Sequence, residues 1–442
     1  MTDSIETPTT LLHRTGRFGR RMIAWATAAG FALIAGSAFA QSDAQKTDDQ
    51  TPDIAPFMQV VDDPTSVTMQ MAVRTLVPAD GQGPTITLFA AIHIGDRSFY
   101  DAIQQMLDAK DLVLFEGVRP TGAGYIAHEK DMTERDRNEF TERRMKFLGS
   151  SVVTYKASHR AYPETLNELS EGVDERIGRV IAGIGEDAWG HQLVYERDLE
   201  TGTFELRSAG SDGELHNNDD IVIDPASDGV YAMETDTEGI QTILAESLGL
   251  VFQLDAMDES GPNWRNSDLS IDQVMERLDE AGVTSFELMD TLQGNTIGTK
   301  IAGFFLKLIG KSKTMRETAK LALVEMLGSA EDLLGALPGE MGTLMQVILE
   351  QRNDVLLADV AHVIEHEPEV KNLGIIYGAG HLRDVQARLE TEFGYVHKSD
   401  EWVDAMSVDL KALGMTQKQA QSMRTMLRRQ INAQMKMLER QR

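Results

Sequence analysis

A strand–helix–strand pattern between residues 85 and 118 constrains the fold of this chain most strongly. The run TITLFAAI at 85–92 is apolar and rich in β-formers, as in a buried strand. A second apolar run, DLVLFEGV, follows at 111–118. Between them, apolar residues recur at helical spacing, namely Phe99, Ile103, Met106 and Leu107. This βαβ pattern predicts an α/β fold with a parallel-type sheet and covering helices.

The same strand-then-helix step recurs near the other end, where LGIIYGAGH at 373–381 precedes LRDVQARLETEF at 382–393. Residues 160–225 differ from the flanking segments in their pattern of apolar residues. They are rich in Gly, Asp and aromatic residues, and their short alternating runs, such as QLVYE and TFELRS, are separated by turn residues. We therefore expect a small antiparallel β-rich domain inserted into the α/β chain, which makes the whole α+β. Helical patterns return from about 236 and continue over 296–365.

A chain of 442 residues is too long for one ordinary core, so we expect two domains plus extensions. The last thirty residues predict a basic amphipathic helix. We favour its packing on its own domain, with contact to an anionic membrane surface or a protein partner as the alternative. The predicted parts are a signal peptide (1–40), a disordered linker (41–60), an α/β domain in two pieces (61–150 and 236–400), the insert (151–235) and the C-terminal helix (401–442).

The N-terminus has the composition of a secretory signal peptide. Basic residues precede the short apolar run MIAWATAAGFALIAG, and the sequence SAFA ends at Ala40 in an A-x-A pattern. The run is short for a membrane span. We expect export and cleavage near Ala40, giving a periplasmic or extracellular protein, with an uncleaved inner-membrane anchor as the alternative.

The net charge and the cysteine content exclude several classes of partner and of catalytic site. The net charge is −28, and the leader contributes four arginines against two acids, so the chain after Ala40 carries −30. A nucleic-acid partner is therefore not expected, because phosphate binding needs clustered Lys and Arg. The absence of cysteine fits an oxidising compartment and excludes disulfides, thiol catalysis and Cys-based zinc sites.

Three polar residues follow apolar strands. His93 comes directly after the first predicted strand, and Glu116 lies at the end of the second. His381 follows the third behind Gly378-Ala379-Gly380. In parallel sheets, ligands collect at the carboxyl ends of strands. Two imidazoles and a carboxylate suit a divalent transition metal that activates water. The alternative is that each histidine is an inert, hydrogen-bonded turn residue.

Two further stretches contain residues of the types that bind metal ions. HVIEH at 362–366 matches the H-x-x-E-H pattern of some zinc proteases, but its polar surroundings favour a solvated helix terminus. SAGSDGELHNNDD at 208–220 places Asp212, Asp219 and Asp220 among glycines. Oxygen ligands in such a loop suit calcium, although the spacing is not that of an EF-hand. An acidic turn without metal is an equal alternative.

Several stretches in order resemble the TraB/Tiki (PrgY, GumN) family. They are AAIHIGD, LVLFEGV, LGLVFQLDAMD, PNWRNSDLS, EQRND and YGAGH, spread over roughly 80–120 and 236–400. That family is recognised by two G-x-x-H motifs, a glutamate after the first, and an Arg-Asn pair between them. Gly378–His381 matches the second motif. In the first motif, Ala90 stands where the family has glycine.

The resemblance implies a metal-dependent hydrolase, most naturally a peptidase. His93 and His381 would be metal ligands, and Glu116 a ligand or general base. Arg352 and Asn353 match the Arg-Asn pair, and Arg352 would hold substrate or polarise a carbonyl. The competing interpretation is a non-catalytic envelope protein that binds a peptide or small-molecule ligand.

The insert resembles a different family. DAWG at 187–190 and Ser208–Gly213 are similar to the C-terminal domain of the major pseudopilin of type II secretion (GspG-like). Its acidic loop implies calcium held by Asp212, Asp219 and Asp220. Ala188 stands where the family usually has proline, and the long hydrophobic N-terminal helix and prepilin cleavage site are missing. We therefore expect a calcium-stabilised module rather than a pilus subunit, with a secretion-associated component as a further alternative.

Overall fold

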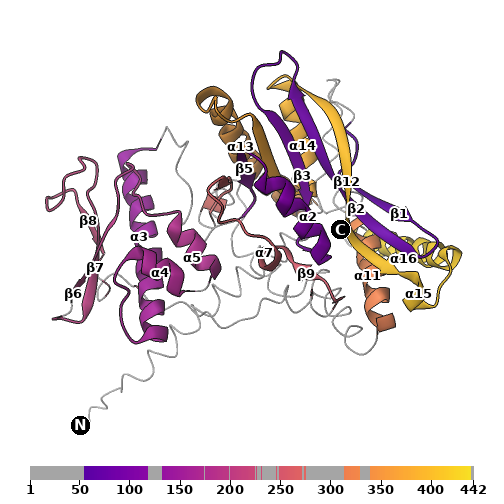
Figure 1. Cartoon of the computed structure of the whole chain (residues 1–442), viewed down its shortest axis with the longest axis horizontal. Helices are drawn as coiled ribbons and strands as arrows, with labels where there is room; N and C mark the ends of the chain where they lie inside the picture. The colour runs from indigo at the N-terminus through magenta and orange to yellow at the C-terminus, as the bar shows by residue number, and fades with distance from the viewer. Residues whose placement is uncertain are drawn as a thin grey trace, which may run out of the picture. The chain divides into compact units, whose positions relative to one another are not determined.

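The computed structural model describes residues 54–117, 313–328 and 339–439, and also residues 132–274 except 174, 199, 224, 226–229, 231–244, 246–247 and 271–272 (Figure 1). The predicted signal peptide lies outside the described residues. The chain divides into two compact units. The insert unit comprises residues 118–237 with 1–30 and 269–273, and the sheet unit comprises residues 31–117, 238–268 and 274–442.

A mixed seven-stranded sheet organises the described part of the sheet unit. Its order is β1-β2-β3-β11-β5-β10, with β12 paired along β2. The pairs β3–β11, β11–β5 and β5–β10 are parallel, and the pairs involving β2 are antiparallel. The strands are β1 (Met58–Asp62), β2 (Ser66–Pro78), β3 (Thr85–Ala91), β5 (Leu112–Phe115), β10 (Trp264–Asn266), β11 (Asn372–Gly378) and β12 (Tyr395–Asp409).

The predicted α/β class is confirmed, and the parallel half of the sheet is the half that the sequence indicated. The antiparallel half was not predicted. In β12, residues 396–401 are exposed and polar apart from one valine, so the strand lacks the apolar alternation that would reveal it. β1 begins at Met58, inside the segment 41–60 expected to be a linker.

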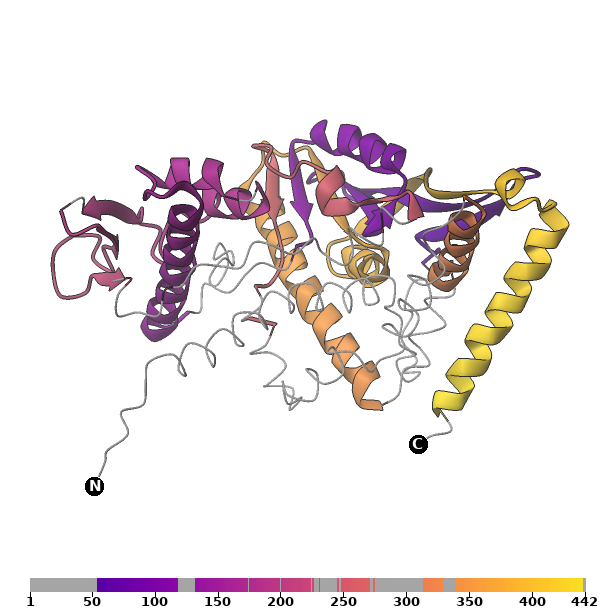
Figure 2. The ribbon, with the colours of Figure 1, turned by 90° about the horizontal axis from the view of Figure 1, so that it is seen from below.

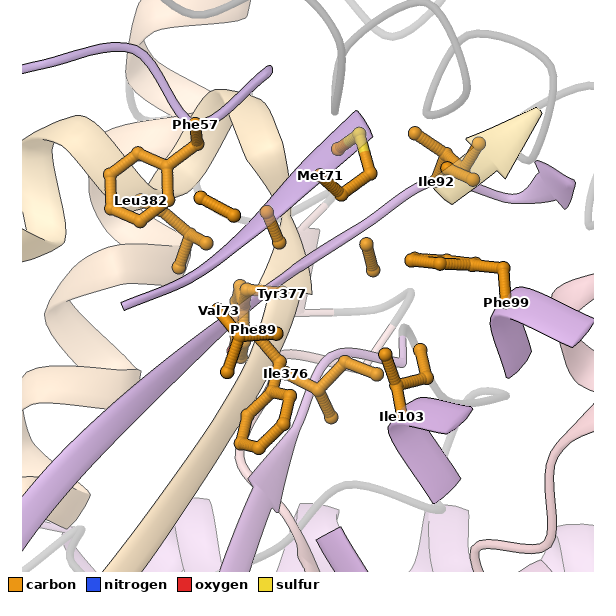
Figure 3. Close-up of a cluster of buried hydrophobic side chains, with 14 of the residues drawn as sticks. Phe57, Met71, Val73, Phe89, Ile92, Phe99, Ile103, Ile376, Tyr377 and Leu382 are labelled. Carbon is orange, nitrogen blue, oxygen red and sulfur yellow. The ribbon is translucent and has the colours of Figure 1, made fainter. Parts of the chain in front are cut away.

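Helices cover both faces of this sheet. β3, α2 (Arg97–Asp108) and β5 form the predicted βαβ unit, and β11 leads into α14 (Ala379–Thr391). Figure 2 shows α2 and α14 on opposite faces. In the core, Phe99 and Ile103 extend from α2, whereas Leu382 of α14 lies beside Phe57 (Figure 3). Burial of these side chains provides most of the driving force for assembling the layers.

The remaining elements of the sheet unit are mostly helical. They are β4 (Ile94–Gly95), β9 (Val251–Phe252), α7 (Gln253–Ala256), α11 (Lys313–Gly328), α13 (Gly339–His366), α15 (Leu410–Leu413) and α16 (Gln417–Glu439). The predicted C-terminal helix is α16, which is shorter than the expected 401–442, because residues 401–409 belong to β12 and α16 begins at Gln417. It docks through Arg424, which bonds Glu325 of α11 and Asp62 of β1, while Arg428 also bonds Glu325. None of the described helices is long and apolar enough to cross a membrane.

The insert unit packs helices on the predicted antiparallel meander. Strands β6 (Val194–Asp198), β7 (Thr203–Ser208) and β8 (Ile221–Ile223) pair in that order. Helices α3 (Glu134–His159), α4 (Leu166–Gly172) and α5 (Glu175–Ala182) precede them. The unit has its own core, built from residues such as Phe147, Val152, Leu206 and Ile223.

Candidate functional site

Three sequence-predicted residues meet at one edge of the sheet. β3, β11 and β5 are adjacent and parallel, so their carboxyl ends lie together. His93 follows β3, Glu116 follows β5, and His381 lies in the first turn of α14 just after β11. Ala90, which stands in place of the expected glycine, is buried within β3 and is paired with Tyr377 of β11 in the register.

His381 is fully buried and has a defined tautomer. Its Nδ1 lies 2.7 Å from Oδ1 of Asn353 on α13. An amide oxygen can only accept, so Nδ1 carries the hydrogen and Nε2 keeps a lone pair. Nε2 lies 3.3 Å from Nη1 of Arg352 and 3.7 Å from Oε1 of Glu116.

Arg352 lies at the centre of the cluster with 1% of its side chain exposed. Its Nε and Nη2 donate to the two oxygens of Asp268, at 2.9 and 2.6 Å. Nη2 also donates to Oε1 of Glu116 at 2.7 Å. The other Glu116 oxygen accepts the backbone N–H of Gly378 at 2.6 Å, where α14 begins. One guanidinium therefore joins two buried carboxylates, and the three groups together carry one excess negative charge.

These contacts determine the protonation states. Burial would raise the pKa of Glu116, but Arg352, the neighbouring imidazoles and the Gly378 N–H lower it to about 2. Burial lowers the pKa of His381 to about 3, with Arg352 acting in the same direction and Glu116 opposing. At neutral pH, Glu116 is a carboxylate and His381 is a neutral imidazole.

His93 presents an unsatisfied nitrogen. Its carbonyl accepts the backbone N–H of Gln253 at 2.7 Å, which fixes the chain between β3 and β4. Its Nε2 is buried and has no hydrogen-bond partner among the described residues. Burial lowers the pKa of His93, so the ring is neutral and Nε2 is a candidate donor to a metal.

The cluster supplies suitable metal donors but does not form a closed metal site. Two imidazole nitrogens and a carboxylate in a region of excess negative charge suit a divalent transition metal. Among the described residues, however, no group of three or more His, Asp or Glu is arranged to hold an ion. Arg352 contacts both Glu116 and His381, so metal binding would require this guanidinium to shift.

Sequence reasoning missed Asp268. Its side chain is fully buried, accepts the N–H of Gly117 at 2.9 Å and binds Arg352. The signal was available: Asp268 comes two residues after β10, which pairs in parallel with β5. The rule that located Glu116 at this sheet edge would have located Asp268 too. Asn353 also has a second partner, because its Nδ2 donates to Asp384 at 2.9 Å.

The HVIEH stretch lies elsewhere, at the C-terminal end of α13. His362 and His366 do share one helix face, and their ring centroids are 4.6 Å apart. Their side chains are 31% and 49% exposed, so the pair is at the surface. This exposure agrees with the solvated helix terminus that the sequence favoured.

The acidic loop of the insert unit is held by its own hydrogen bonds. Asp219 Oδ2 accepts from Ser211 Oγ and from the N–H of Asp212, both at 3.2 Å. Asp212 bonds the N–H of Glu214 at 2.8 Å. Asp220 Oδ2 pairs with Nη1 of Arg207 at 2.5 Å, whereas its Oδ1 is buried without a hydrogen-bond partner among the described residues. The three aspartates are thus in one loop, with one orphaned carboxylate oxygen.

The two stretches that carry the pseudopilin resemblance meet at Asp187. This buried carboxylate accepts the backbone N–H groups of Trp189 and His191 at 3.0 and 2.8 Å. Its other oxygen accepts the hydroxyl of Ser208 at 2.6 Å. Asp187 therefore joins the turn before β6 to the end of β7, where the acidic loop begins.

The insert unit packs a helix with a three-stranded antiparallel meander that carries an acidic loop. Residues 130–224 match the family model described as type II secretion system (T2SS), protein G. The chain thus carries a T2SS protein G domain, and this fits an envelope or exported protein. Comparison with curated proteins and with solved structures finds no significant match for this chain.

Proposed function

We propose that the sheet unit is a metal-dependent hydrolase of the TraB/Tiki type that cleaves peptide bonds. The observation that carries the proposal is the buried cluster at the sheet edge. Its three charged groups carry one excess negative charge, the Nε2 of His381 has a lone pair that faces Arg352, and the Nε2 of His93 has no hydrogen-bond partner among the described residues. Imidazole nitrogens and a buried carboxylate are ligands that a divalent transition metal prefers. The order of the matching sequence stretches supports the same assignment.

His93 and His381, with Glu116 as a third ligand, would hold a divalent transition metal that polarises a carbonyl and acidifies a bound water. Asn353 fixes the tautomer of His381 and so directs its lone pair. We assign Glu116 as a ligand rather than a general base, because a pKa of about 2 leaves little basicity at neutral pH. Arg352 is assigned as a positioning residue because its 1% exposure leaves little access for substrate.

Cleavage of a peptide library by the purified full chain tests this proposal. We expect cleavage that a chelator abolishes, that added Zn²⁺ or Co²⁺ restores, and that is lost in His381→Ala. The matched control is His397→Ala, since His397 is an exposed histidine on β12 bonded to Asp400. Peptide binding without cleavage by any metal-loaded sample would support the alternative, a non-catalytic envelope binding protein.

We propose separately that the insert unit is stabilised by calcium held by Asp212, Asp219 and Asp220. The family match and the orphaned buried Oδ1 of Asp220 support this, because a hard cation suits an unsatisfied carboxylate oxygen. Arg207 already neutralises the other oxygen, so we expect modest calcium affinity. Calcium should raise the melting temperature of the full chain. Asp219→Ala should remove the effect, and Asp198→Ala, in a different acidic turn, should retain it.

We further propose that the protein is exported and acts in the cell envelope, after leader cleavage near Ala40. The protein G domain supports this location, since the family's name assigns it to a secretion system. N-terminal sequencing of the protein recovered from an expressing bacterium tests the proposal. A mature chain that begins at Gln41 is expected, whereas an intact leader on envelope material would favour the membrane-anchored alternative.

A further inference from the structure

The HVIEH stretch carries a feature that the proposed hydrolase does not use. His362 and His366 are one helical turn apart on α13, and their rings are stacked, with centroids 4.6 Å apart and an interplanar angle of 21°. Residues separated by four positions lie next to each other on a helix surface. Two imidazoles at this spacing can, after rotation of their side chains, both direct a nitrogen to one metal ion, as the two histidines of helical zinc motifs do.

Charges around the pair favour a cation. Glu367 Oε1 lies 3.9 Å from Nε2 of His362, and Glu365 Oε2 lies 4.0 Å from Nδ1 of His366. Two ligand atoms of a tetrahedral zinc ion are about 3.4 Å apart, so a small side-chain rotation would bring Glu367 into range. The pair also lies in the last turn of a long helix, where the partial negative charge of the carbonyls attracts cations.

Arg265 limits the ligand set. It forms a two-pronged ion pair with Glu367, with N···O distances of 2.7 and 3.0 Å. This guanidinium repels a metal that would take Glu367 as a strong ligand. The two imidazoles are therefore the principal ligands, and the carboxylates contribute mainly through their charge, with water completing the coordination.

We infer that His362 and His366 form a second, surface site for a divalent transition metal such as Cu²⁺, Ni²⁺ or Zn²⁺. The Irving–Williams order predicts that Cu²⁺ binds most tightly to such an imidazole pair. The site is structural rather than catalytic, because both rings are substantially exposed and α13 ends beside them. A metal there would stabilise the end of the helix that also carries Arg352 and Asn353.

Calorimetric titration of the metal-stripped full chain with ZnCl₂, together with Cu²⁺ electron paramagnetic resonance, tests the inference. His362→Ala and His366→Ala should each remove one equivalent of bound Zn²⁺ and reduce the nitrogen coordination of Cu²⁺. His397→Ala, which removes a surface histidine that bonds Asp400, is the matched control and should leave both readouts unchanged. Both paired histidines are surface residues, so their replacement should not prevent folding.

His381→Ala separates this site from the proposed hydrolase centre. The variant should keep the equivalent that depends on His366, even if it loses another. The inference is overturned if His362→Ala and His366→Ala leave the stoichiometry unchanged. It is also overturned if His397→Ala lowers the stoichiometry equally, because the surface imidazoles would then bind metal one at a time.

Discussion

Replacing Arg352 by methionine should destabilise the sheet unit strongly and in a pH-dependent way. The substitution keeps the side-chain length but leaves Glu116 and Asp268, which are 8% and 0% exposed, without their shared cation. Glu116 has a pKa of about 2 against an ordinary value of 4.5. A shift of that size corresponds to about 3 kcal/mol of stability at pH 7. Removing one partner of a buried ion pair typically costs about 3–5 kcal/mol, which agrees.

The sign of the pH dependence follows from the lowered pKa. The stabilisation of the Glu116 carboxylate is complete above pH 4.5 and is lost as the pH falls through 2. The difference in free energy of unfolding between wild type and Arg352→Met should therefore fall from about 3 kcal/mol at pH 7 to about 1.5 kcal/mol at pH 3. Urea unfolding followed by circular dichroism across this range measures it. Arg74→Met, which removes a buried arginine from a single partly exposed acid, is the control. A loss below 1 kcal/mol at pH 7, or one that does not change with pH, would refute the reasoning.

Three further predictions concern other parts of the chain. Burial raises the pKa of Asp359 to about 6, so ionisation of this carboxyl lowers the free energy of unfolding as the pH rises from about 4 to 6. Asp359→Asn should therefore make the free energy of unfolding, measured with urea, depend less on pH over this range. Gly210 has φ +61°, and an added Cβ would lie 2.3 Å from the Asp219 carbonyl oxygen. Gly210→Ala should therefore lower the melting temperature of the insert unit more than a change at Gly190, which has open space. Glu325→Ala leaves Arg424 without its buried partner, so limited proteolysis should cut α16 faster than in wild type.

The sequence predicted the parts of the fold that have short-range signals. The βαβ pattern located β3, α2 and β5, and the turn residues around QLVYE and TFELRS located β6 and β7. β12 was missed because its exposed polar stretch pairs with β2 through backbone hydrogen bonds, which leave no periodic pattern in the side chains.

The sequence predicted the members of the candidate site that lie at the ends of strands. The rule that ligands collect at the carboxyl ends of parallel strands needs only the strand directions, and it predicted one sheet edge for His93, Glu116 and His381. The position of Arg352 between Glu116 and Asp268 depends on how α13 crosses that edge, and residue spacing carries no such information. The protonation states likewise depend on burial and on hydrogen-bond partners from segments far apart in the sequence.

Metal content measured on the purified full chain tests the central claim most directly. The measurement is best made in a His366→Ala background, which removes the surface histidine pair. We predict one equivalent of transition metal per chain, lost when either His93 or His381 is also replaced by alanine. An equal metal content in all three proteins, or no metal even after incubation with Zn²⁺, would contradict a metal centre at the sheet edge.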